Sequence, residues 1–190
     1  MSVALEELRR RNLRTILALA ALFLVPLAAS FWLYYGAGWR PAATTNHGEL
    51  IEPPRPLPTL VLPKVFGEHW ALVYVGDGRC DPDCRQALYV MRQTRLELNS
   101  DMTRLQRVFL VTGDCCDRAF LEREHPGLQV VDASGAAAQP LLAQFPSEDR
   151  AHSVYIVDPL GNLMMRHDAR RNPRGLFEDL KQLLRLSHIG

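Results

Sequence analysis

The chain has little that points to nucleic acid, to a disulfide-built miniprotein or to a repeat architecture. Its 22 basic and 21 acidic residues give a formal net charge of +1, so no positive excess attracts nucleic acid. Four cysteines in 190 residues are too few for a fold held together by disulfides. No internal repeat or long low-complexity stretch is present. Behind an N-terminal segment, the chain is long enough for one ordinary domain.

Charged residues are missing altogether from Thr15 to Gly38. A stretch of this length crosses the hydrocarbon core of a bilayer as a helix, at about 1.5 Å per residue. The preceding residues, 1–14, carry four arginines, whereas Arg40 is the first charge that follows. The positive-inside rule then predicts a cytoplasmic N-terminus, a transmembrane anchor over residues 15–38 and an extracytoplasmic domain. In a bacterium this domain would lie on the periplasmic side of the inner membrane.

The same segment has a second interpretation, as a cleavable signal peptide. Leu27-Ala28-Ala29 supplies small residues after an apolar run, as a cleavage site requires. The apolar stretch continues through Phe31 to Tyr35, however, which is longer than a signal peptide needs. We therefore expect a retained single-pass anchor.

Residues 39–63 are rich in proline. Proline fixes φ and cannot donate to a β-ladder, so this stretch predicts an extended tether with one edge strand near Thr59–Leu62. The folded domain is then expected over residues 64–190.

Within that domain, short β-rich runs alternate with segments of helical spacing. The expected order is strand 70–76, helix 84–98, strand 107–113, helix 116–124, strand 128–132, short helix 140–145, a hairpin of strands 153–159 and 162–167, and helix 173–186. Strand–helix–strand units followed by an antiparallel hairpin and a closing helix predict a thioredoxin-like α/β fold. In that fold a central mixed sheet is flanked by helices.

The first cysteine pair, Cys80 and Cys84, falls between the first core strand and the first helix. Open α/β sheets place their sites at such turns, and the start of a helix stabilises a thiolate. Two soft sulfurs four positions apart suit a redox-active dithiol/disulfide pair or a soft-metal site. A purely structural disulfide is the alternative, but a bond across so short a loop adds little stability.

The stretch 70–88, with its Cys-x-x-x-Cys, resembles the Sco/SenC family of copper chaperones. The second motif of the resemblance, AHSVYIVDPLG at 151–161, places a histidine before a strand and Asp-Pro-x-Gly. The resemblance implies that Cys80, Cys84 and His152 bind copper, as Cu(I) or Cu(II), for the copper centre of cytochrome c oxidase. An oxidase subunit or another copper acceptor is then the expected partner. Because Gly76-Asp77-Gly78-Arg79 replaces the family's usual aromatic, Thr and His, we expect a divergent member.

The remaining cysteines and histidines carry weaker signals. Cys115 and Cys116 follow the second core strand, and strain in the ring disfavours a bond between neighbours. One of them could resolve a disulfide of the first pair or add a copper ligand, or one could be buried and the other cap a helix. The other histidines are expected at the surface: His47, His69, His125, His167 and His188.

Three functions remain open from the sequence. The first is a copper chaperone, and the second is an extracytoplasmic thiol-disulfide oxidoreductase that acts on a partner's cysteines. The absence of a Cys-x-x-Cys, the usual spacing of general thiol reductants, weighs against broad redox catalysis. The third is a tethered adaptor without chemistry. His152 distinguishes the first function from the second, because a three-ligand copper site needs this histidine and a dithiol switch does not.

Overall fold

The computed structural model describes residues 2–38, 45–58, 65–114, 116–187 and 189–190. The chain divides into two compact units, Met1–Thr45 and Asn46–Gly190, and each is described by itself.

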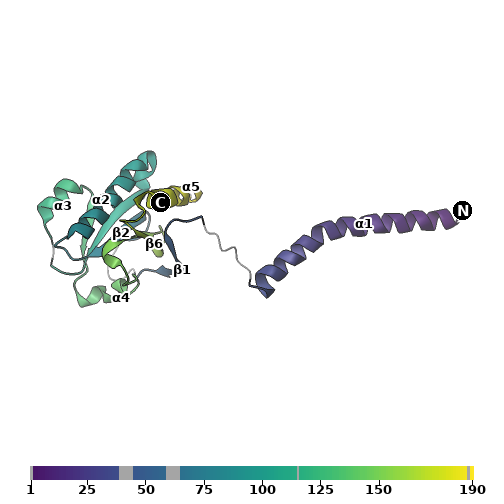
Figure 1. Cartoon of the computed structure of the whole chain (residues 1–190), viewed down its shortest axis with the longest axis horizontal. Coiled ribbons are helices and arrows are strands. Elements are labelled where there is room, and N and C mark those ends of the chain that lie inside the picture. The colour runs from purple at the N-terminus through teal and green to yellow at the C-terminus, as the bar shows by residue number, and fades with distance from the viewer. Residues whose placement is uncertain (1, 39–44, 59–64, 115, 188) are drawn as a thin grey trace. The chain divides into compact units, whose positions relative to one another are not determined.

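The first unit is a long helix, α1 (Ser2–Phe31), that continues into a π-helical turn, η1 (Trp32–Gly36) (Figure 1). Among the described residues, Arg9–Gly36 is the one stretch long and apolar enough to cross a membrane, and none of its most apolar part is buried. Pro26 lies within α1. This helix fits a single-pass anchor, although length and composition alone would also fit a signal sequence.

The second unit is built on a six-stranded mixed sheet in the order β1-β6-β5-β2-β3-β4. The strands are β1 (Glu49–Pro56), β2 (Trp70–Gly76), β3 (Leu105–Val111), β4 (Leu128–Asp132), β5 (Ser153–Val157) and β6 (Asn162–Asp168). Strands β2, β3 and β4 are parallel, whereas β5 is antiparallel to β2 and β6, and β6 is antiparallel to β1. The parallel strands place the ends of β2 and β3 at one edge of the sheet, where the cysteines follow.

Helices cover both faces of the sheet (Figure 1). The helices are α2 (Pro82–Glu97), α3 (Arg118–Glu124), α4 (Gln139–Leu142) and α5 (Pro173–Leu186), joined by 3₁₀ turns η2 (Asn99–Arg104), η3 (Ala136–Ala138) and η4 (Arg150–His152). On β2, Leu72 and Tyr74 face the layer of α2, α3 and α5, while Val73 and Val75 face the layer of η3 and α4. Side chains of a strand alternate between faces, so the apolar run of β2 fills two cores. The predicted helix-flanked mixed sheet is confirmed.

The proline-rich stretch differs from the expected tether. Strand β1 lies within it and forms the edge of the sheet, antiparallel to β6. Its pairing is irregular between Leu50 and Arg55, where Pro53 and Pro54 stand, and an irregular edge strand tolerates residues without an N–H. The strand expected near Thr59–Leu62 lies outside the described residues.

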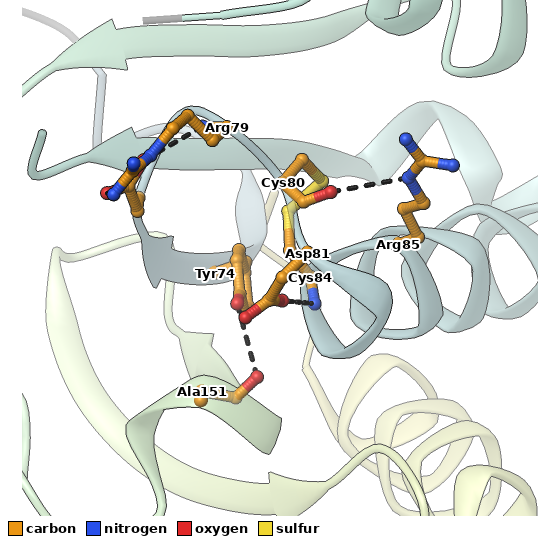
Figure 2. Close-up of a disulfide and its surroundings, with 8 residues drawn as sticks. Tyr74, Arg79, Cys80, Asp81, Cys84, Arg85 and Ala151 are labelled. Carbon is orange, nitrogen blue, oxygen red and sulfur yellow. Dashed lines mark hydrogen bonds and ion pairs between the residues drawn. A yellow bond between two sulfur atoms is a disulfide. The ribbon is translucent and has the colours of Figure 1, made fainter. Parts of the chain in front are cut away.

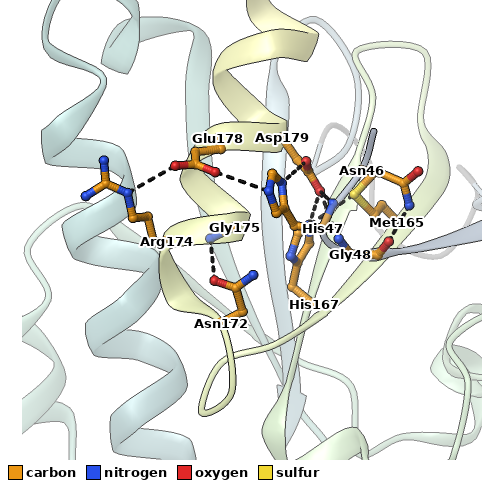
Figure 3. A network of polar contacts seen from close by, with 10 residues as sticks. All are labelled: Asn46, His47, Gly48, Met165, His167, Asn172, Arg174, Gly175, Glu178 and Asp179. Carbon is orange, nitrogen blue, oxygen red and sulfur yellow. Dashed lines mark hydrogen bonds and ion pairs between the residues drawn. The ribbon is translucent and has the colours of Figure 1, made fainter. Parts of the chain in front are cut away.

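A polar network joins the start of this unit to α5 (Figure 3). The buried Asp179 carboxylate accepts hydrogen bonds from the backbone N–H of His47 at 2.8 Å and of Gly48 at 2.9 Å. Its Oδ1 lies 2.9 Å from Nδ1 of His47, and its Oδ2 lies 3.3 Å from Nε2 of His167. These contacts fix the chain just before β1 to the helix that closes the fold.

The expectation that the remaining histidines lie at the surface is wrong for two of them. His167 is 3% and His125 is 5% exposed, whereas His47 and His69 are exposed and His188 lies outside the described residues. His167 follows the inward alternation of Leu163 and Met165 along β6. Burial lowers the pKa of His167 to about 4, although Asp179 favours its protonated form.

Candidate functional site: the oxidised cysteine pair and the turn that carries His152

The turn after β2 is shaped by the residues that start α2. The Asp81 carboxylate accepts a hydrogen bond from the backbone N–H of Cys84 at 2.9 Å, and Pro82 occupies the first turn of the helix. An aspartate cap with proline behind it is a favourable helix start, because it satisfies one unpaired N–H and presets φ. Cys84 is thereby held in the first turn of α2, as predicted.

Cys80 and Cys84 are joined by a disulfide, with their Cα atoms 5.0 Å apart (Figure 2). Both residues are buried, at 4% and 2% exposure, and belong to the core between the sheet and α2. Cys80 has a positive φ of 47°, which is uncommon for a residue other than glycine. The Nε of Arg85 donates to the carbonyl oxygen of Cys80 at 3.3 Å and helps to hold this conformation.

The loop that leads into Cys80 is closed by its own side chains. The Asp77 carboxylate accepts hydrogen bonds from the backbone and the guanidinium of Arg79, and the N–H of Cys80 donates to the Asp77 carbonyl at 3.3 Å. Hydrogen bonds from Arg79 lower the pKa of Asp77. The loop therefore carries an exposed ion pair between Asp77 and Arg79, close in sequence to the disulfide.

Tyr74 connects β2 to the turn η4 that carries His152. Its hydroxyl donates to the carbonyl oxygen of Ala151 at 3.1 Å (Figure 2). Burial raises the pKa of Tyr74, and the carboxylates of Asp81 and Asp83 raise it further, so the phenol stays a donor. Gly76 leaves room for this ring, because a Cβ there would lie 2.7 Å from the tyrosine Cε1.

His152 lies at the end of η4, directly before β5, where the sequence places it. Its Nδ1 is 3.3 Å from Oδ2 of Asp83, in the first turn of α2. This nitrogen is shielded from solvent and has no hydrogen-bond partner of good geometry among the residues that the structure describes. The structure thus brings His152 to the helix turn that holds Cys84, across 68 residues of sequence.

The described residues contain no ready three-ligand metal cluster of His, Cys, Asp or Glu. The sulfurs of Cys80 and Cys84 are bonded to each other, so they are not thiolates in this state. The roles of Cys80, Cys84 and His152 as copper ligands therefore remain a prediction for the reduced protein.

The second cysteine pair is only partly described. Cys115 lies outside the described residues. Cys116 is half-buried against the core cluster that contains Cys80 and Cys84, and its sulfur is disulfide-bonded. Because Cys80 and Cys84 are joined to each other, Cys116 is bonded to neither of them here. A resolving or ligating role for Cys115 or Cys116 remains a prediction.

Sequence reasoning missed three residues of this site: Tyr74, Asp81 and Asp83. The Asp-Pro that precedes the helix was a signal for Asp81 as its cap. No local pattern indicates that Tyr74 reaches Ala151 or that Asp83 reaches His152, because both contacts join distant segments.

A mixed sheet between helices, with an oxidisable cysteine pair where the first core strand meets its helix, defines a thioredoxin-like protein. A family model described as the transmembrane-like, thioredoxin-like, C-terminal domain matches residues 70–187. The chain belongs to this family. No curated protein matches the chain significantly.

Several solved structures resemble the domain. The structure of yeast Sco1 with copper bound has a TM-score of 0.51 and 16% identity, and the match covers 64% of this chain and 81% of that one. The structure of ScoI from Bradyrhizobium japonicum with copper bound has a TM-score of 0.47 and 17% identity, and the match covers 62% of this chain and 86% of that one. A SCO1/SenC family lipoprotein of Bacillus anthracis str. Ames has a TM-score of 0.47 and 13% identity, and the match covers 64% of this chain and 82% of that one. At an identity of 16%, the similarity to the yeast structure shows the fold of the domain. Yeast Sco1 belongs to the family that the cysteine and histidine motifs resemble.

Proposed function

We propose that the chain is a membrane-anchored copper-binding chaperone whose reduced Cys80 and Cys84, together with His152, hold one copper ion as cargo. The observation that supports this most is the contact between His152 and Asp83, which brings the histidine to the turn of the cysteine pair. Two thiolates and an imidazole suit Cu(I) and, with a weak fourth ligand, also Cu(II).

The surroundings of His152 fit a metal-binding imidazole. Metal-bound histidines commonly direct their other ring nitrogen at a carboxylate, which orients the ring. Nδ1 of His152 faces Asp83, so Nε2 is the candidate ligand atom. The hydrogen bond from the Tyr74 hydroxyl to the Ala151 carbonyl oxygen stabilises the turn η4, which carries His152.

The structure, in which Cys80 and Cys84 form a disulfide, then corresponds to the oxidised, copper-free state of the protein. Two electrons and two protons from an extracytoplasmic thiol reductant convert it to two thiols, which lose their protons when they bind copper. We propose that the copper passes by ligand exchange to an acceptor, and that this acceptor is a cytochrome c oxidase subunit. The N-terminal helix would retain the domain outside the cytoplasm, where such a subunit exposes its copper site.

Copper binding is tested by competition with a chromophoric Cu(I) chelator, using the full chain in detergent micelles, reduced by a phosphine. We expect one Cu(I) per chain, no tight binding by Cys80→Ser or Cys84→Ser, and weaker binding by His152→Ala. His69→Ala, which removes an exposed histidine elsewhere, should bind as the parent does. If the reduced parent binds no Cu(I), the proposal fails.

The second candidate, a thiol-disulfide oxidoreductase, is favoured by the bond itself and by the capped helix start at Cys84. In this reaction a partner dithiol and the disulfide exchange two electrons and two protons through a mixed disulfide. Equal rates of reduction of a peptide disulfide by the parent and by His152→Ala, together with no copper binding, would favour this function.

A further inference from the structure

A groove lies between α2 and α3, beside the disulfide turn. Its volume is about 420 Å³. It begins at Pro82, next to the cysteine pair, and ends at Arg92 and His125. Tyr89, which is 52% exposed, and Phe120 supply its aromatic walls. The groove therefore has aromatic walls with polar side chains between them, and Arg92 and His125 stand at its far end.

A buried cation that has no counter-ion among the described residues lies near Arg92 and His125, outside the lining of the groove. Arg107 on β3 is only 3% exposed, and its Nη2 donates to the carbonyl oxygen of Pro126 at 2.6 Å. Its Nε and Nη1 are buried, and within the described part of the chain they have no hydrogen-bond partner and no carboxylate forms an ion pair with Arg107. The adjacent His125, 5% exposed, also has a buried Nδ1 without a partner.

The charged neighbours of this cluster are mainly cations. Burial and, to a smaller extent, the positive charges of Arg95 and Arg92 together lower the pKa of Arg107 to about 10. Among the described residues, the carboxylate that lines the groove is Glu124, which accepts a hydrogen bond from Arg123 at 2.9 Å and whose pKa is lowered by Arg123 and, to a smaller extent, by Arg92 and His125. A buried cation with unsatisfied hydrogen-bond donors is unfavourable unless an anion binds to it. The cluster therefore has the chemistry of a site for a carboxylate.

The groove is also connected to the cysteine turn. The guanidinium carbon of Arg85 lies 5.0 Å from the centre of the Phe120 ring, and Arg85 Nε donates to the carbonyl oxygen of Cys80. A ligand between Tyr89 and Phe120 would contact the same arginine that holds the disulfide turn.

We propose that this groove is the docking site for an acidic segment of the partner protein that exchanges copper or electrons with the cysteine pair. An aromatic or aliphatic side chain of the segment lies between Tyr89 and Phe120. An adjacent carboxylate lies against Arg92 and His125 and offsets the charge of Arg107, which is buried near these two residues. The choice of a protein partner rests on the proposed function, whereas the choice of acidic chemistry rests on the cluster alone.

Isothermal titration calorimetry tests this with the oxidised full chain in detergent micelles and no copper. The probe is a capped hexapeptide of glutamate, tryptophan and leucine, and its twin has glutamine for glutamate. We expect the acidic peptide to bind about ten-fold or more tightly than the twin, because charge complementarity selects between them. Arg92→Gln should weaken binding of the acidic peptide, and Arg118→Gln, which removes an exposed charge of α3 outside the groove, should not.

Arg107→Met separates docking from a merely structural role. Under the proposal it weakens binding of the acidic peptide and leaves the thermal unfolding midpoint unchanged or raised, because an uncompensated buried charge is removed. A lowered midpoint with unchanged binding would overturn the proposal. So would equal binding of the two peptides, or inorganic phosphate that competes as strongly as the peptide, since that describes a small-anion site. None of these readouts depends on copper or on thiol chemistry, so failure of the chaperone function is measured separately.

Discussion

The buried histidine of β6 should make the stability of the domain sensitive to mild acid. His167 lies between the sheet and α5, with Nε2 3.0 Å from the sulfur of Met165 and 3.3 Å from Oδ2 of Asp179 (Figure 3). The Asp179 carboxylate is already engaged by two backbone N–H groups and the ring of His47. One carboxylate therefore serves two histidines, and the buried one stays neutral.

The magnitude follows from the two protonation states. Burial lowers the pKa of His167 from 6.5 to about 4, so between these values the unfolded chain binds a proton that the folded chain does not. Stability due to this residue is complete above pH 6.5 and falls as the pH falls toward 4. The shift corresponds to roughly 3 kcal/mol of unfolding free energy lost over this window. His47 acts in the opposite sense, because Asp179 raises its pKa and its contribution is lost as the pH rises through the raised value.

Urea unfolding of the full chain in detergent micelles, followed between pH 7 and pH 4 by the fluorescence of buried Trp70, measures this loss. His167→Gln keeps a donor for Asp179 but cannot titrate, so its stability should fall less than that of the parent over the window. Met165→Leu removes the sulfur contact and keeps the imidazole, so it should retain the pH dependence of the parent. If the unfolding free energy of the parent and of His167→Gln falls equally between pH 7 and pH 4, then the titration of His167 does not cause the loss of stability.

Three further predictions follow from single features. Asp81→Ala removes the cap of α2 and should lower the unfolding free energy by about 1 kcal/mol, whereas Asp81→Asn should retain most of it; equal losses would deny the cap. Gly48→Ala would place a Cβ 2.4 Å from Nε2 of His167 and should cost about 1–3 kcal/mol in urea unfolding; an unchanged midpoint would contradict this packing. Reporter fusions after residue 40 should be active only as extracytoplasmic reporters, and cytoplasmic activity would reverse the proposed orientation.

Most of the fold could be predicted from the sequence, because its periodic patterns are strong. The apolar run of β2 and the spacing of Leu176, Leu180 and Leu184 along α5 identify a buried strand and an amphipathic helix without tertiary information. Strand β1 could not be found this way, because its prolines suggest an extended tether. It forms only because β6 offers an edge on which an irregular strand can pair.

The candidate site was predictable in its residue types and not in its contacts. Cys80 and Cys84 stand out by their spacing and by their place after a strand. The pairing of Asp83 with His152 and the unpartnered charge of Arg107 depend on which segments the fold brings together. The surface assignment of His125 and His167 failed for a related reason. A histidine on the inward side of a strand or at a helix end is buried when a neighbouring element covers it.

The central claim is that the reduced cysteine pair and His152 form one copper site. X-ray absorption spectroscopy of the full chain, reduced and loaded with one equivalent of Cu(I) in detergent micelles, tests it most directly. We expect two sulfur ligands and one imidazole nitrogen in the parent, and loss of the nitrogen in His152→Ala with both sulfurs retained. Identical spectra for the parent and His152→Ala, or a parent spectrum without two sulfurs, would contradict it.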